Sequence, residues 1–91
     1  MANKIDYLEI QGYEISLDKK LKKDIKKYHW SINEHKDRVN HRIRGNVNGK
    51  TKTLQRFIKE KSISRELNNF ERVYFQNNDR LDYTTNNLII K

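Results

Sequence analysis

The sequence predicts an α+β domain with a small antiparallel sheet and a basic helix, followed by a strand–loop–helix unit. Two dipeptides that favour tight turns, Gln11-Gly12 and Asn48-Gly49, lie between segments of alternating polar and apolar residues. Between the two turns, apolar residues recur at helical spacing. The chain has 91 residues, of which 34% are hydrophobic and 35% are charged. We therefore expect a single domain, residues 1–91, with a small core.

The charge balance indicates a polyanionic partner. The chain has 20 Lys and Arg residues against 12 Asp and Glu residues, which gives a formal net charge of +8. A positive field of this size attracts polyanions. Nucleic acid is the commonest of them, because phosphate contacts supply most of the sequence-independent affinity. The alternative is a basic surface that serves solubility alone.

The composition argues against several other classes of protein. The chain has no cysteine, so we expect neither disulfides nor a thiolate metal site, and we expect no cofactor. No apolar run approaches the ~20 residues of a membrane span. The segment Met1–Ile10 lacks the basic start and the apolar centre of a signal peptide. We therefore expect a cytoplasmic protein that does not bind membranes.

The first predicted elements are a hairpin and a lysine-rich helix. Strands are expected at Tyr7–Ile10 and Tyr13–Leu17, on either side of the first turn. Asp18 can cap a helix over about Lys19–Tyr28. The apolar residues of this helix are Leu21, Ile25 and Tyr28. Most of the other positions are lysines, which repel one another at i,i+4. An anionic partner would relieve that repulsion, and we expect phosphate contacts from Lys19, Lys22, Lys23 and Lys26.

A further set of antiparallel strands is predicted around Asn48-Gly49, the strongest two-residue hairpin signal. We expect strands at Trp30–Asn33, Arg38–Val47 and Thr51–Leu54. Pairing outward from the turn places Val47 opposite Lys50, Asn46 opposite Thr51, Gly45 opposite Lys52, Arg44 opposite Thr53 and Ile43 opposite Leu54.

Alternation along these strands separates an apolar face from a polar face. The apolar face, joined by Trp30 and Ile32, consists of Val39, His41, Ile43, Val47 and Leu54. The polar face consists of Arg38, Asn40, Arg42, Arg44, Asn46, Thr51 and Thr53. Arginine can bind guanine edges or phosphates, Asn and Thr can reach bases or the backbone, and a ribbon of strands fits the major groove. The alternative is the solvated outer face that any half-buried antiparallel sheet shows.

The motifs that follow one another along the chain resemble a family of nucleases. A lysine-rich helix leads into "YHWSI", a strand pair turns at "NGK", and "TLQRFI" and "VYFQNNDRLDYTTNNL" come next. From about Glu14 to Leu88 the chain resembles phage-type HNH homing endonucleases with an AP2-like sheet. The resemblance implies an AP2-like helix and sheet at about 14–54 and an HNH-like remnant at about 55–91. We expect a helix over about Gln55–Lys61 and a final strand–turn–helix from Val73, the unit that holds one divalent metal in the family.

The residues at the family's catalytic positions are altered. In the family, an Asp at the position of Tyr74 binds the metal, and a His at the position of Phe75 is the general base. An Asn that matches Asn87 completes the metal site, and a further His falls on Gln55. Only Asn87 is retained. A neutral phenol binds a hard cation poorly and phenylalanine accepts no proton, so we expect a degenerate site without metal or DNA cleavage.

Other acids and histidines do not replace the missing groups. Asp82 matches an aspartate that the family keeps, and we expect it to cap the last helix and order the loop before it. His41 lies on the apolar face and is expected in the core. No pair among His29, His35 and His41 has the spacing of a metal site.

Three functions remain open. The first is a catalytically inactive, HNH-derived nucleic-acid-binding protein of phage or mobile-element origin, which binds duplex DNA through the Arg38–Thr53 sheet and the Lys19–Lys27 helix. The second is a small viral inhibitor of host defence that binds a host nuclease or an RNA–protein effector complex, and exposed aromatic residues would favour it. The third is a residual nuclease with a rearranged site. We prefer the first and therefore do not expect an enzyme.

Overall fold

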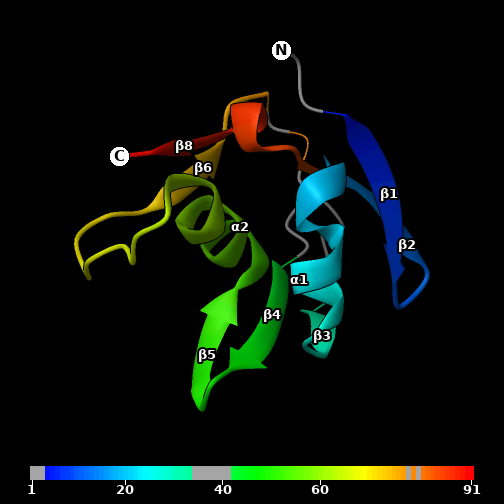
Figure 1. Cartoon of the computed structure of the whole chain (residues 1–91), viewed down its shortest axis with the longest axis horizontal. Coiled ribbons are helices and arrows are strands. Elements are labelled where there is room, and N and C mark those ends of the chain that lie inside the picture. Colours follow the sequence, from blue (N-terminus) through cyan, green and yellow to red (C-terminus); the bar gives the residue numbers. More distant parts are fainter. Residues whose placement is uncertain (1–3, 34–41, 78, 80) are drawn as a thin grey trace.

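The computed structural model describes residues 4–33, 42–77, 79 and 81–91, with Asn33 and Arg42 described by their backbone alone. The chain has an α+β fold (Figure 1). The strands are β1 (Ile5–Ile10), β2 (Tyr13–Asp18), β3 (Trp30–Asn33), β4 (Arg42–Val47), β5 (Lys50–Thr53), β6 (Val73–Phe75), β7 (Asp82–Tyr83) and β8 (Leu88–Ile90). The α-helices are α1 (Lys22–Lys26) and α2 (Leu54–Ile63), and the 3-10 turns are η1 (Lys19–Leu21) and η2 (Thr85–Asn87).

Both predicted turns are present and set the register of their hairpins. Gln11 and Gly12 have φ angles of 49° and 89°, and Asn48 and Gly49 have φ angles of 53° and 86°. Positive φ at both central residues is the type I′ geometry, whose twist matches that of antiparallel strands. The predicted pairing of β4 with β5 is confirmed from Val47–Lys50 to Arg44–Thr53. Leu54 is the first residue of α2, so its predicted pairing with Ile43 is wrong.

The first sheet is mixed rather than purely antiparallel, in the order β1-β2-β7. β2 pairs with β1 in antiparallel and with β7 in parallel, where Ser16 lies opposite Asp82 and Leu17 opposite Tyr83. Leu17 and Tyr83 are both fully buried. A residue close to the C-terminal end of the chain therefore completes the core beside the N-terminal hairpin.

The lysine-rich helix is shorter than predicted. The turn η1 leads into α1, which ends at Lys26 instead of Tyr28. Leu21 and Ile25 are buried as expected. The indole N–H of Trp30 donates to the carbonyl oxygen of Ile25 at 2.7 Å, so an acceptor in the last turn of α1 is satisfied by a side chain of β3.

The predicted capping role of Asp18 is wrong. Its side chain makes no capping hydrogen bond to η1, although Asp18 precedes that turn. Asp18 is 2% exposed, and its carboxylate accepts a hydrogen bond from the hydroxyl of Thr85 at 2.6 Å. It also accepts from the backbone N–H of Thr85 at 3.3 Å. A buried carboxylate needs such donors, so Asp18 caps η2 from a distant part of the chain.

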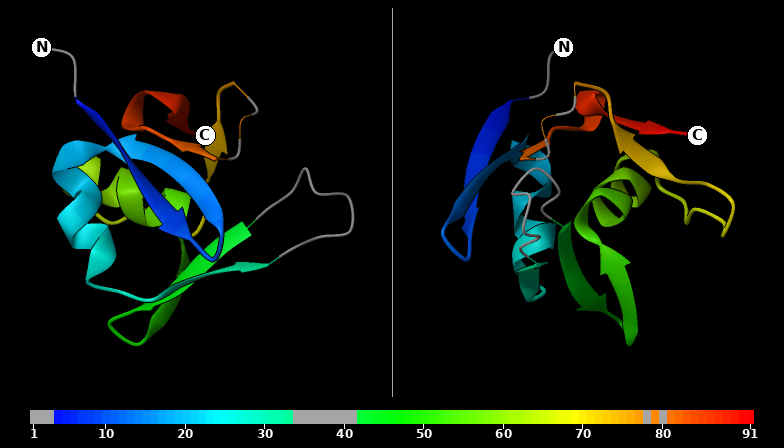
Figure 2. Two further views of the ribbon diagram at one scale, coloured as in Figure 1. Left: turned by 90° about the vertical axis from the view of Figure 1, so that its right-hand side faces the viewer. Right: turned by 180° about the vertical axis from the view of Figure 1, so that it is seen from behind.

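The second sheet has the order β3-β4-β5, and α2 follows β5 directly. Trp30 lies opposite Gly45, and a Cβ atom added to Gly45 would lie 2.6 Å from Cε3 of Trp30. The indole ring therefore requires a glycine beneath it. The predicted helix at Gln55–Lys61 is confirmed and is slightly longer. In Figures 1 and 2, α1 lies between the β1–β2 hairpin and the β4–β5 hairpin.

The predicted C-terminal helix is absent. The predicted strand begins at Val73 as expected and is β6. In residues 81–91, all of which the structure describes, β7, the short turn η2 and β8 follow in place of a helix. β8 pairs with β6 in antiparallel, with Val73 opposite Ile90 and Phe75 opposite Leu88. The run Leu88-Ile89-Ile90 favours a strand because its branched side chains pack across to β6. α2 packs against both β6 and η2.

Candidate functional site

The outer face of the β3-β4-β5 sheet, meaning the face turned away from Trp30 and Ile43, carries polar side chains as predicted. Arg44 lies between Ser31 and Thr53, and Asn46 lies opposite Thr51. Arg44, Asn46 and Thr51 are exposed, and Thr53 is half-buried. On the opposite face, Ile43 is fully buried and Val47 is 6% exposed.

Part of the predicted interface cannot be placed on this face. Arg38 and Asn40 lie outside the described residues, as do Val39 and His41. Arg42 begins β4 opposite Asn33, so its backbone belongs to the same sheet. The sequences of β3, β4 and β5 are WSIN, RIRGNV and KTKT, and none of them contains an Asp or a Glu. The three strands therefore offer basic and neutral groups to an anionic ligand.

Asn46 also has a structural role that the sequence analysis did not assign to it. Its side-chain oxygen accepts a hydrogen bond from the backbone N–H of Gly49 at 2.9 Å. Asn commonly stabilises a tight turn in this way. The carboxamide oxygen is therefore used within the hairpin, and its amino group is the part that can reach a ligand.

The predicted lysines of η1 and α1 differ in their surroundings. Lys19, Lys23 and Lys26 are exposed. Lys22 is half-buried and forms an ion pair with Asp6 at 3.3 Å. The pKa of Asp6 is lowered, first by the N–H of Tyr7 and then by Lys22. Lys22 therefore contributes less positive field to a ligand than the three exposed lysines.

Tyr74 and Phe75, which the resemblance places at catalytic positions, lie on opposite faces of β6. Tyr74 is 45% exposed and lies opposite Ile89, and the ammonium of Lys91 is 5.7 Å from the centre of its ring. Phe75 packs against the core, with its ring 5.2 Å from that of Tyr83 in an edge-to-face arrangement. The position at which the resemblance places a general base is thus filled by an inward-facing apolar side chain.

Asn87 and Asp82 order the loop between β6 and η2. Asn87 is 7% exposed. Its side-chain amino group donates a hydrogen bond to the carbonyl oxygen of Asp82 at 3.0 Å, and its side-chain oxygen accepts one from the backbone N–H of Asn77 at 3.0 Å. The Asp82 carboxylate accepts from Thr84, Asn77 and Ser16. Burial raises the pKa of Asp82, but these hydrogen bonds outweigh it and the pKa is lowered. Asp82 thus orders the loop as expected, while the helix that it was predicted to cap is absent.

The residues that the resemblance assigns to a degenerate site are Gln55, Tyr74, Phe75 and Asn87. In the part of the chain that the structure describes, no three His, Cys, Asp or Glu side chains gather in a group that could hold an ion. Gln55 lies in the first turn of α2 and is half-buried. The oxygen of Asn87 that would bind a cation already accepts a backbone hydrogen bond.

The chain matches no protein-family model, no curated protein and no solved structure. The resemblance to HNH homing endonucleases therefore stays a prediction from the motifs. Among the described residues, no helix is both long enough and apolar enough to cross a membrane.

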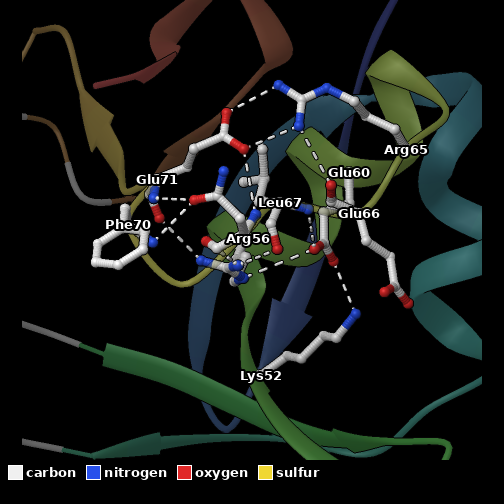
Figure 3. A network of polar contacts seen from close by, with 9 residues as sticks. Lys52, Arg56, Glu60, Arg65, Glu66, Leu67, Phe70 and Glu71 are labelled. Carbon is white, nitrogen blue, oxygen red and sulfur yellow. Dashed lines mark hydrogen bonds and ion pairs between the residues drawn. The ribbon is translucent and has the colours of Figure 1, made fainter.

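A cluster of charged residues that was not predicted from the sequence lies at the junction of β5, α2 and the segment after α2 (Figure 3). Glu60 is 9% exposed and accepts hydrogen bonds from Lys52 at 2.8 Å and from the N–H of Leu67 at 2.8 Å. Arg56 lies 3.7 Å from the same carboxylate. Burial raises the pKa of Glu60, but Lys52, the Leu67 N–H and Arg56 together lower it. The i,i+4 spacing of Arg56 and Glu60 was the one signal in the sequence.

An open pocket of about 400 Å³ lies beside this cluster. Tyr28, Val47 and Phe57 give it apolar walls, and the ring centres of Tyr28 and Phe57 are 5.6 Å apart. The ammonium of Lys61 lies 5.7 Å from the centre of the Phe57 ring. Two of the cations that line the pocket are already engaged with internal partners. Lys52 pairs with Glu60, and Lys61 lies over the ring of Phe57.

Proposed function

We propose that this protein is a catalytically inactive nucleic-acid-binding protein, derived from an HNH nuclease of phage or mobile-element origin, whose ligand is duplex DNA. The observation that carries the proposal is the acid-free outer face of the β3-β4-β5 sheet, on which Arg44, Asn46 and Thr51 are exposed. Arginine binds guanine or phosphate in a forked geometry, and a ribbon of strands fits the major groove. The net charge of +8 supplies the long-range attraction.

The same arrangement supports binding without cleavage. Phe75 faces the core, Tyr74 has a phenol in place of a carboxylate, and the oxygen of Asn87 is engaged with Asn77. We expect purified protein with Mg²⁺ or Mn²⁺ to leave duplex DNA intact, because Tyr74 and Phe75 stand where the resemblance places the metal ligand and the general base. Metal-dependent nicking that disappears in Asn87→Ala would revive the residual nuclease.

Fluorescence anisotropy with a labelled DNA duplex tests the interface. Arg44→Ala and Lys23→Ala each remove one exposed positive charge, so they form a matched pair. We expect Arg44→Ala to weaken binding by roughly tenfold, and Lys23→Ala by less, because an arginine on a sheet is held in place more firmly than a helix lysine. Each lost phosphate contact should also flatten the plot of log affinity against log salt by about one unit.

Two results would contradict the proposed interface. One is the absence of any salt-dependent binding by the wild-type protein. The other is an Arg44→Ala variant that binds duplex as tightly as the wild type. Arg44→Lys separates charge from geometry, because lysine keeps the charge but not the forked donors.

A protein-binding function is the second candidate, in which a small viral inhibitor blocks or redirects a host nuclease or an RNA–protein complex. A specific observation favours it, because the aromatic ring of Phe70 is 91% exposed. Protein interfaces are enriched in such aromatic side chains. A pull-down from host lysate with and without nuclease treatment separates the candidates, since a nucleic-acid bridge is lost on treatment and a direct protein partner is kept.

A further inference from the structure

Phe70 stands out among the exposed large hydrophobic side chains of the described residues. It is 91% exposed, whereas Ile5 and Tyr7 are 56% exposed and Tyr74 is 45% exposed. It lies in the 64–71 loop, meaning the stretch from Ser64 to Glu71 within the connection between α2 and β6, and it is not part of the core. The fold therefore gains almost no burial energy from this side chain.

The base of the 64–71 loop is held by side chains of α2. Glu60 accepts the N–H of Leu67 at 2.8 Å. The guanidinium of Arg56 donates to three carbonyl oxygens of the loop, those of Leu67 at 2.6 Å, Asn68 at 2.9 Å and Glu71 at 3.0 Å. Figure 3 shows both side chains reaching from α2 into the loop. The backbone on either side of Phe70 is thus tied to a helix that packs in the core.

The tip of the loop is held by its own residues. The side-chain oxygen of Asn68 accepts the N–H of Phe70 at 2.9 Å and that of Glu71 at 3.0 Å. Arg65 and Glu71 form two parallel hydrogen bonds of 2.9 Å and 2.8 Å. In Figure 3 the Phe70 ring points away from these contacts. The loop backbone from which the ring projects is therefore held in one conformation.

An ordered loop that presents one aromatic ring is suited to binding a partner. Association costs less entropy when the contact residue is already fixed, because little conformational freedom is left to lose. A few aromatic residues that enter a pocket commonly dominate the affinity of a protein interface.

The charge of the loop distinguishes between a protein and a nucleic acid as the partner. Within residues 64–72, the whole segment between α2 and β6, Arg65 and Arg72 stand against Glu66 and Glu71, a formal net charge of zero, while the whole chain carries +8. Arg65 is engaged with Glu71, and Arg56 of α2 donates to three carbonyl oxygens of the loop. Proteins that stack bases on aromatic rings surround those rings with cations, which neutralise the phosphates that arrive with each base. The segment around Phe70 has no excess of positive charge, so a protein partner is favoured.

We propose that the 64–71 loop is a docking element whose Phe70 ring enters an apolar pocket on a partner protein. This inference rests on the second candidate function and names the residue that makes the contact. It leaves the outer face of the β3-β4-β5 sheet free, because Arg44 lies on a different element. One chain can therefore hold a protein and DNA at separate surfaces.

Photo-crosslinking followed by calorimetry tests the proposal. The full chain with Phe70→p-benzoylphenylalanine is irradiated in nuclease-treated bacterial lysate, and the crosslinked peptide is sequenced. Tyr7→p-benzoylphenylalanine is the matched control, because Tyr7 is exposed on another element. The protein identified is then purified and titrated with the wild type, Phe70→Ala and Tyr7→Ala. We expect an apolar crosslinked segment, an affinity lowered at least 30-fold by Phe70→Ala and an affinity within threefold of wild type for Tyr7→Ala.

Each of the other outcomes overturns the proposal. If only the probe at Tyr7 captures a protein, a protein-binding function survives and the role of Phe70 is wrong. If neither probe captures a protein, both fail. If sedimentation shows a dimer of this chain that Phe70→Ala dissociates, a second copy occupies the ring instead. If Phe70→Ala weakens binding of a single-stranded oligonucleotide tenfold or more, Phe70 is a base-stacking residue.

Discussion

Replacement of Glu60 by alanine tests whether its carboxylate holds α2, β5 and the 64–71 loop together. The change leaves the N–H of Leu67 without its acceptor, and an unsatisfied buried donor costs about 1–3 kcal/mol. Lys52 also loses its partner, but its side chain is 18% exposed and can extend into water, so we assign that loss about 0.5–1 kcal/mol. Arg56 keeps its three carbonyl acceptors. We expect Glu60→Ala to lower the free energy of unfolding by about 2–4 kcal/mol.

Urea unfolding followed by circular dichroism gives this free energy directly. Glu60→Gln should lie between the wild type and Glu60→Ala, because its amide oxygen can still accept the N–H of Leu67 but carries no charge. Glu66→Ala is the control, since Glu66 is exposed and its removal should change the free energy by less than about 0.5 kcal/mol.

Hydrogen exchange provides a second, local measurement of the same change. The N–H of Leu67 should be protected in the wild type and should exchange much faster in Glu60→Ala, because its acceptor is gone. A Glu60→Ala variant that loses less than about 1 kcal/mol and keeps Leu67 protected would show that the carboxylate does not hold the loop.

Three further changes have expected outcomes. Gly45→Ala places a Cβ atom 2.6 Å from the Trp30 ring and should lower the free energy of unfolding by about 3 kcal/mol. Thermal unfolding should show a large drop in Tm, and an unchanged Tm would mean that the ring can move aside. Ser64→Gly should raise stability by about 1 kcal/mol in urea, because Ser64 has a φ of 59°, and a loss of stability would contradict this. Arg65 and the Asn68 N–H lower the pKa of Glu71 from 4.5 to about 2, so stability from this group is present above pH ~4.5 and lost as the pH falls toward ~2. Glu71→Gln should flatten that part of the pH–stability curve, and an identical curve would refute the assignment.

Local turn chemistry made much of the sheet structure predictable. Gln11-Gly12 and Asn48-Gly49 both adopt positive φ at both positions, and the second of them fixed the pairing of β4 with β5 to the residue. Period-two alternation then placed Ile43 and Val47 in the core and Arg44 outside. These features depend on neighbouring residues, which is the information that a single sequence contains.

Features that depend on distant residues were not predictable. Asp18 has the spacing of a helix cap, but its carboxylate bonds to Thr85, which no local pattern indicates. The segment after Tyr83 has no strong helix signal, and pairing with β6 makes it a strand. The candidate surfaces differ in the same way. The polar face around Arg44 depends on alternation between neighbouring residues and was predicted. The exposure of Phe70 depends on a loop conformation that Arg56 and Glu60 stabilise, and it was not predicted.

The parallel pairing of β2 with β7 has a consequence for how the chain folds during synthesis. Ser16 forms a hydrogen bond with Asp82 across 66 positions, and Asp18 forms one with Thr85 across 67 positions. The β1-β2-β7 sheet therefore lacks its third strand until the segment around β7 has left the ribosome. Contacts of such high sequence separation slow folding, because a long loop must close before they form. Until then, the apolar face around Ile15 and Leu17 lacks Tyr83 as a cover. We expect folding to be late and cooperative, with the two ends of the chain becoming ordered in the same step.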